Sequence, residues 1–201
     1  IIVKDKTVKS LCIKAKITLQ EATNWFANNN LMLNKDKTHI LTFSASNKIS
    51  SGLCAKVLGI CVDDRLTWIN HIDYVVSKLS KSLFVLRTLK RAISIKTLIS
   101  CYFSLFHSHL LYGVTLWGNA PKSNKAFIMQ KKAIRVIVGA QFRAHCQRYF
   151  RQLRIMPLPS IFMYTALLEI HKKLSTFPTN DTTHSYNTRN AKNLRIPYFR
   201  L

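Results

Sequence analysis

Acidic residues are scarce in this chain of 201 residues. It has 31 Lys and Arg against only 8 Asp and Glu, so its formal net charge is +23. Positive side chains repel one another in a compact protein. We therefore expect a polyanionic partner, either nucleic acid or an anionic membrane surface. A small-molecule enzyme would not need such a surface. The excess lies in the last two thirds: residues 1–73 have 10 basic and 6 acidic side chains, and residues 74–201 have 21 and 2.

Cysteine motifs and glycine-rich phosphate loops are also missing. The five cysteines, Cys12, Cys54, Cys61, Cys101 and Cys146, are odd in number, widely spaced and form no CxxC pair. This argues against a disulfide framework or a zinc site and favours a reducing, intracellular compartment. No GxxxxGK or GxGxxG sequence occurs, and no Ser/His/Asp or Cys/His set can be assembled. The residue patterns of the chain therefore predict no complete catalytic site, no metal site and no cofactor.

One stretch has no charged residue at all. Residues 98–120 contain no Lys, Arg, Asp or Glu and are long enough to span a bilayer. Ser100, Ser104, His107 and Ser108 nevertheless recur at helical spacing and would form one polar stripe. We therefore expect a largely buried core helix rather than a membrane span, and no membrane partner.

Hydrophobic periodicity predicts an α+β fold that begins with a small β-containing part. An apolar stripe with a period of 3.6 residues runs from Val8 to Phe26 and predicts an amphipathic helix capped by Asp5. Strands are expected at 1–3, 38–43 and 56–62, and a polar loop at 44–52. Gly59 lies inside the last strand and suggests a bend or a close approach of the backbone.

The pattern becomes helical from His71 onward. Ser160 is expected to cap a helix that runs to Lys173, and the residues from Phe177 on are polar. We expect three parts: a β-containing part at 1–70, a helical, basic region at 71–176, and an extended or disordered tail at 177–201.

Asp63 and Asp64 form the most conspicuous acidic pair. Adjacent carboxylates after a strand can hold Mg²⁺. Arg65 follows them directly, and no third acidic residue has a suitable spacing. The pattern therefore favours a turn that closes the strand over a metal site.

Eight basic side chains gather within 30 residues of the helical region, with no acidic residue among them. They are Lys125, Lys131, Lys132, Arg135, Arg143, Arg148, Arg151 and Arg154. Lysine and arginine neutralise phosphates, and the aromatic residues between them could stack on bases or belong to the core. The pattern predicts a nucleic-acid-binding surface, and a solvated face without a partner is the other interpretation.

Six groups of short motifs follow one another along nearly the whole chain. They are Trp25 with NLMLNKDKT (30–38) and Phe43; VLGICVD (57–63) with LTW (66–68) and HI (71–72); Ser108 with LYG (111–113) and WG (117–118); QKKAIR (130–135); HC (145–146) with Phe150 and LRI (153–155); and HSYNTR (184–189). In order and spacing, the series resembles the reverse transcriptase of non-LTR retrotransposons, of the LINE type and closest to the jockey-like clades.

The resemblance implies a fragment that covers the end of the palm, the thumb and the following region. Such enzymes copy RNA into DNA with two Mg²⁺ ions held by palm aspartates, which the resemblance places before Ile1, so this chain alone would be inactive. Lys37 matches a palm lysine that is thought to assist pyrophosphate departure as a general acid. Leu58 and Gly59 match the primer-grip hairpin, whose backbone approaches the primer end, and Asp63 belongs to that pattern without being a metal ligand.

Two functional hypotheses follow. In the first, the chain binds an RNA template and a DNA primer together with the rest of the reverse-transcriptase polypeptide, and the complete enzyme requires Mg²⁺. In the second, it is a non-catalytic, basic helical nucleic-acid-binding module, domesticated or inert. An Ala-Asp-Asp turn upstream in the parent reading frame would favour the first.

Overall fold

The computed structural model describes residues 1–43, 54–182, 186 and 188–195. The loop expected at 44–52 lies outside the described residues, as does part of the motif at 184–189. Most of the described chain is helical, and its strands form a two-stranded antiparallel sheet, which confirms the expected α+β class.

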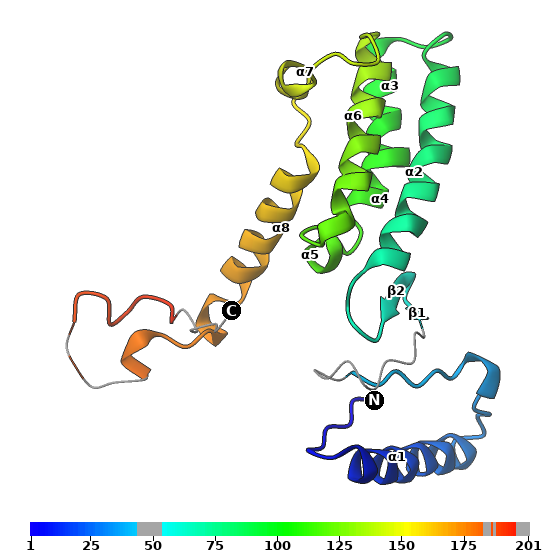
Figure 1. Cartoon of the computed structure of the whole chain (residues 1–201), viewed down its shortest axis with the longest axis vertical. Coiled ribbons are helices and arrows are strands. Elements are labelled where there is room, and N and C mark those ends of the chain that lie inside the picture. Colours follow the sequence, from blue (N-terminus) through cyan, green and yellow to red (C-terminus); the bar gives the residue numbers. More distant parts are fainter. Residues whose placement is uncertain (44–53, 183–185, 187, 196–201) are drawn as a thin grey trace.

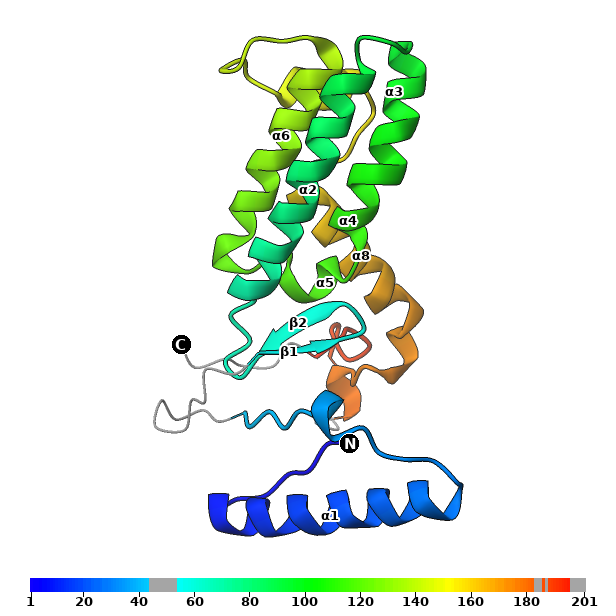
Figure 2. The ribbon, with the colours of Figure 1, turned by 90° about the vertical axis from the view of Figure 1, so that its right-hand side faces the viewer.

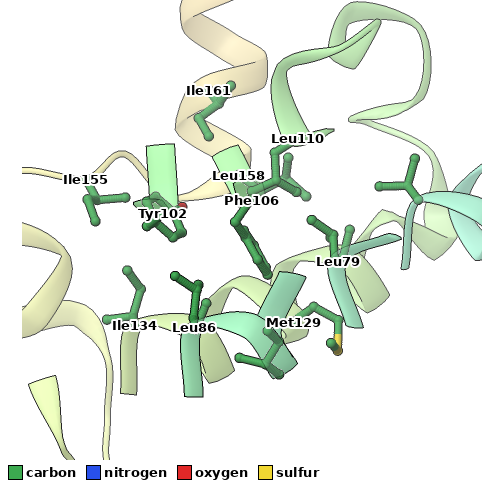
Figure 3. Close-up of a cluster of buried hydrophobic side chains, with 14 of the residues drawn as sticks. Leu79, Leu86, Tyr102, Phe106, Leu110, Met129, Ile134, Ile155, Leu158 and Ile161 are labelled. Carbon is green, nitrogen blue, oxygen red and sulfur yellow. The ribbon is translucent and has the colours of Figure 1, made fainter. Parts of the chain in front are cut away.

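Four helices form a helical body around one apolar core (Figure 1). They are α2 (Ile69–Leu89), α3 (Ile95–Tyr102), α6 (Asn124–Val138) and α8 (Leu158–Lys172). The shorter elements between them are a π-helical turn (Phe103–His107), α4 (Ser108–Leu111), α5 (Val114–Trp117), a 3₁₀ turn (Pro121–Ser123) and α7 (Gln147–Gln152). Figure 3 shows the side chains that meet in the core, among them Leu79, Leu86, Tyr102, Phe106, Leu110, Ile134 and Ile161, all 0% exposed.

A single buried amide links three helices of this body. Gln130 on α6 donates from Nε2 to the Tyr102 hydroxyl (3.0 Å) and to the Met156 carbonyl (2.9 Å), and its Oε1 accepts from the Leu158 amide (2.8 Å). Because both ends of the amide have partners, burying it leaves no polar atom unsatisfied. Gln130 therefore fixes α6 against α3 and against the start of α8.

The uncharged stretch at 98–120 was expected to be one largely buried helix, but only one face of it is in the core and it is not one helix. Tyr102, Phe106 and Leu110 are fully buried, whereas Phe103, Leu105 and Leu111 are more than 40% exposed. α3 passes into the π-helical turn, α4 ends at Leu111 with Tyr112 as its C-cap, and Gly113 (φ 61°) precedes α5. In the π-helical turn the Leu105 carbonyl accepts a hydrogen bond from the Ser82 hydroxyl at 2.8 Å. Within residues 1–43 and 54–182, no helix combines the length and apolarity that crossing a membrane requires.

The first helix, α1 (Val8–Asn28), lies apart from the helical body, beyond the β-strands (Figures 1 and 2). Its bounds match the predicted amphipathic helix, but its cap does not. Thr7 accepts a hydrogen bond from the Ser10 amide at 3.3 Å, whereas Asp5 pairs with Lys14 at 2.7 Å. The apolar stripe of α1 lines a hollow of about 320 Å³ that it shares with residues 38–43.

The strands expected at 1–3 and 38–43 are wrong. Ile1 and Ile2 are 89% and 86% exposed, and neither segment pairs with a strand. A strand needs a neighbour for its backbone hydrogen bonds, and the described residues offer these two segments none. Local alternation of apolar residues was therefore not sufficient to form a sheet.

The last helix begins two residues earlier than its predicted cap. Pro157 is the N-cap of α8 and Pro159 lies in its first turn, a position that suits proline because the N–H it lacks would be unpaired there. Ser160 is therefore inside the helix. After α8 the chain forms a 3₁₀ turn at Leu174–Thr176 and another at Asn180–Thr182. The described part of the tail then turns back on itself, because Leu194 pairs with Thr179 across an isolated β-bridge.

Candidate nucleic-acid interface

The expected strand at 56–62 is a tight hairpin. β1 (Cys54–Val57) pairs antiparallel with β2 (Ile60–Asp63), and Leu58 and Gly59 form the two-residue turn. Both turn residues have positive φ, 48° and 84°, as the hairpin turn of type I′ requires. The Leu58 side chain is 85% exposed at the tip. The hairpin implied by the family resemblance is thus present, whereas the periodicity alone had predicted one strand.

The corner between α4 and α5 holds this hairpin in place. The Tyr112 hydroxyl donates to the Leu58 carbonyl, and a Cβ on Gly59 would lie 3.7 Å from the Tyr112 ring. A Cβ on Gly113 would lie only 2.8 Å from the Ile60 side chain, so the corner and β2 are in close contact. These contacts leave ordinary space at Gly59, and its positive φ is what favours glycine there.

His71, near the start of α2, supports the second strand. Its Nδ1 accepts a hydrogen bond from the Cys61 amide at 3.3 Å, and its ring packs edge-on to Trp117 with centroids 5.9 Å apart. The imidazole is 1% exposed, and its Nε2 has no hydrogen-bond partner among the residues that the structure describes. Burial lowers the pKa of His71, which keeps the ring neutral and Nδ1 free to accept.

Asp63 closes the strand, as the sequence predicted, and orders the entry to α2. Its carboxylate accepts from the Thr67 amide and hydroxyl, both at 2.8 Å, and from the Trp68 amide at 3.0 Å. Burial alone would raise the pKa of Asp63, but the hydrogen bonds from Thr67 and Trp68 outweigh it and hold the pKa below its usual value. In the part of the chain that the structure describes, no three His, Cys, Asp or Glu side chains come together as a metal-binding group.

The eight basic candidates do not form one patch. Lys125, near the start of α6, lies 2.5 Å from the Asp73 carboxylate of α2, so it already has an acidic partner. This corrects the expectation that Lys125 belongs to a basic surface free of acidic residues. Arg148 stacks on the Tyr149 ring, 4.6 Å from its centroid, and Arg154 is an exposed residue with a φ of 53° after α7.

Four of the remaining five lie around a hollow of about 560 Å³ between α6 and α7, and the fifth, Lys132, does not line it. Its lining includes Lys131, Arg135, Arg143 and Arg151, together with Phe127, His145, Phe150 and Ser160. Arg135 donates from Nε to the Ala144 carbonyl at 2.9 Å, and this bond holds the turn at 139–146 against α6. The Lys131 ammonium lies over the Phe127 ring, 4.1 Å from its centroid.

A second basic hollow, of about 420 Å³, lies against Arg135 as well. It is lined by Arg87, Lys90 and Arg91 from the end of α2, by Lys132 and Arg135 from α6, and by Val136, Gly139, Ala140 and Phe142. Sequence reasoning missed these three cations, Arg87 in the last turn of α2 and Lys90 and Arg91 just after it, because they precede α6 by more than 30 residues. Among the described residues, no carboxylate pairs with any cation of the two hollows.

The two hollows and the hairpin lie at opposite ends of the helical body (Figure 1). α2 connects the two ends, and its 21 residues span about 30 Å at 1.5 Å per residue. Lys37 belongs to neither group. It ends a 3₁₀ turn (Lys35–Lys37) after α1, where its side chain is exposed and its amide donates to the Asn34 side chain at 3.0 Å.

The arrangement suits binding to phosphates, because cations that pair with no carboxylate of the described chain converge from three helices around two hollows. We call this surface the basic end; it comprises Arg87, Lys90, Arg91, Lys131, Lys132, Arg135, Arg143 and Arg151. No protein-family model, no curated protein and no solved structure matches the chain.

Proposed function

We propose that the chain binds the template–primer duplex of an RNA-directed DNA polymerase of the non-LTR retrotransposon type, as the part that includes the end of the palm and the thumb. The observation that carries the proposal is the basic end, where cations from α2, α6 and α7 meet without a carboxylate partner in the described chain. Phosphate binding by such cations releases counterions and is favourable for any base sequence. The family itself rests on the motif series given above.

The hairpin supports a role at the primer end. Its tip presents the Leu58 side chain and a glycine backbone, and Tyr112 and His71 hold the two strands against the helical body. A tip that is already fixed loses little conformational freedom when a ligand binds, so it can position a nucleic-acid end. We therefore assign positioning to the hairpin and phosphate binding to the basic end.

Binding of an RNA–DNA duplex tests the proposal. A labelled primer–template should bind the purified chain tightly at low salt, and two duplexes of unrelated sequence should bind with the same affinity, because phosphates carry no sequence information. Absence of binding at low salt, or binding to one sequence only, would contradict it.

A second experiment separates a polymerase part from a basic module without a role in synthesis. In the complete parent protein, Leu58→Asn removes the apolar tip and keeps the turn, because asparagine tolerates positive φ. The proposal expects slower primer extension with unchanged duplex affinity. Unchanged extension would favour the module.

A further inference from the structure

The hollow between α2 and α6 contains a feature that a duplex-binding surface does not need. Phe142 lines this hollow and is 74% exposed, and in the described chain its ring makes no aromatic or cation–π contact. A duplex presents phosphates on its outside and keeps its bases stacked inside. An exposed phenyl ring beside a phosphate-binding surface is instead typical of proteins that bind single strands, where unpaired bases can stack on it.

The charges around this ring have one sign. The hollow is lined by five cations, Arg87, Lys90, Arg91, Lys132 and Arg135, and by no acidic residue of the described chain. Its volume of about 420 Å³ lies within the range of small-ligand pockets. The phosphates on both sides of one nucleotide would therefore find cations from α2 on one side and from α6 on the other.

The backbone that carries Phe142 is held at both ends. Gly139 (φ 73°) ends α6, and the Ala140 amide donates to the Arg135 carbonyl at 3.0 Å, which turns the chain back at the end of the helix. A Cβ on Gly139 would stand 3.0 Å from the Lys90 ammonium, so the turn passes close to the end of α2. On the other side of Phe142, the Ala144 carbonyl accepts the bond from Arg135. The ring is thus presented by a turn that is already ordered.

From this we infer that the hollow is a subsite for one nucleotide of a single strand, with the base on the Phe142 ring and the flanking phosphates on the surrounding cations. The inference rests on the proposed function and deepens it, because it adds single-stranded nucleic acid to the duplex as a partner. Stacking on a phenyl ring accepts any base, so single-stranded RNA and DNA of mixed sequence should both bind.

The test compares a labelled single strand with an RNA–DNA duplex on the purified chain. Phe142→Ala and Phe142→Leu should each weaken binding of the single strand about tenfold, equivalent to about 1.4 kcal/mol, and leave duplex binding unchanged. Phe142→Trp should retain single-strand binding, and the added tryptophan should lose fluorescence when bases stack on it. Phe84→Ala is the matched control, because Phe84 is 70% exposed on α2 and does not line the hollow.

The outcomes separate the two proposals. If wild-type chain binds both nucleic acids and Phe142→Ala changes neither affinity, or lowers both equally, the subsite is wrong and the proposed function stands. If wild-type chain binds the single strand but not the duplex, the duplex proposal fails and the subsite is judged by the Phe142 variants. Binding of neither at low salt overturns both.

Discussion

The Tyr112 hydroxyl donates a hydrogen bond to the Leu58 carbonyl, across 54 residues of sequence. The two residues belong to two short motifs, VLG at 57–59 and LYG at 111–113, that the sequence presents only as separate segments. In the fold they form one contact, in which the helical body holds the tip of the hairpin. The hydroxyl, rather than the ring alone, connects them.

Removing that hydroxyl should loosen the hairpin. Tyr112→Phe deletes one hydrogen bond, which is worth about 1 kcal/mol in net stability. We expect faster hydrogen exchange at the backbone amides of β1 and β2, with little change in α6. Tyr164→Phe is the control, because Tyr164 is an exposed residue of α8. Equal exchange in wild type and Tyr112→Phe would show that the ring contact alone holds the tip.

Gly59 should tolerate asparagine better than alanine. Its φ of 84° lies in the region that alanine adopts only with strain, at a cost of about 1 kcal/mol or more. Denaturant unfolding should show Gly59→Ala as the less stable variant, and a neutral Gly59→Ala would contradict the turn assignment. A Gly59→Val substitution in the complete enzyme would strain the same turn. A loss of primer extension in that variant would therefore reflect disruption of the turn as well as any close approach of the primer to Gly59.

Asp63 should make stability depend on pH in the acidic range. Its pKa in the folded chain lies below the value in the unfolded chain, so the unfolded state takes up the proton first as pH falls. The stabilisation is therefore complete above about pH 4 and is lost as pH falls through the lower, folded pKa. Asp63→Asn should be less stable at neutral pH and show a flatter acid profile. A profile identical to wild type would mean that the three hydrogen bonds contribute nothing.

The buried histidines should make folding stability depend on pH in a higher range than Asp63 does. Burial lowers the pKa of both His71 and His107, so the unfolded chain binds protons below about pH 6.5 while the folded chain resists them. Stability should therefore fall as pH decreases from 6.5 toward the folded pKa values. His71→Leu combined with His107→Leu should remove this slope, even if the variant is less stable overall, whereas His171→Gln, at an exposed position, should keep it. A slope that persists in the double variant would assign it to other groups.

Strong periodicity allowed the long helices to be predicted from sequence. The stripe from Val8 to Phe26 corresponds to α1, and the apolar positions from Ile72 to Leu86 correspond to the buried face of α2. The hairpin was hidden, because an apolar Leu58 occupies a turn position where asparagine, aspartate or glycine is usual. Gly59 suggested a bend within the expected strand, but only the resemblance indicated a hairpin.

The composition of the basic end depended on packing between distant segments. Arg87 and Lys90 line the same hollow as Lys132 because α2 packs along α6, and no local pattern indicates that packing. The same packing brings Asp73 to Lys125 and neutralises a residue that the sequence had placed among the nucleic-acid-binding candidates. The Gln130 network and the π-helical turn likewise have no signature in the hydrophobic pattern.

The salt dependence of duplex binding tests the central claim most directly. Each phosphate contact contributes about 0.9 to the slope of log K against log salt. Lys132→Ala combined with Arg151→Ala should lower the slope by roughly 1 to 2 and weaken duplexes of every sequence alike, because these two cations belong to the basic end. Lys4→Ala combined with Lys6→Ala removes the same charge from the N-terminal segment and should leave the slope unchanged, as should Lys125→Ala. An unchanged slope in the Lys132/Arg151 variant, or an equal loss in the Lys4/Lys6 control, would contradict the assignment of phosphate binding to the basic end.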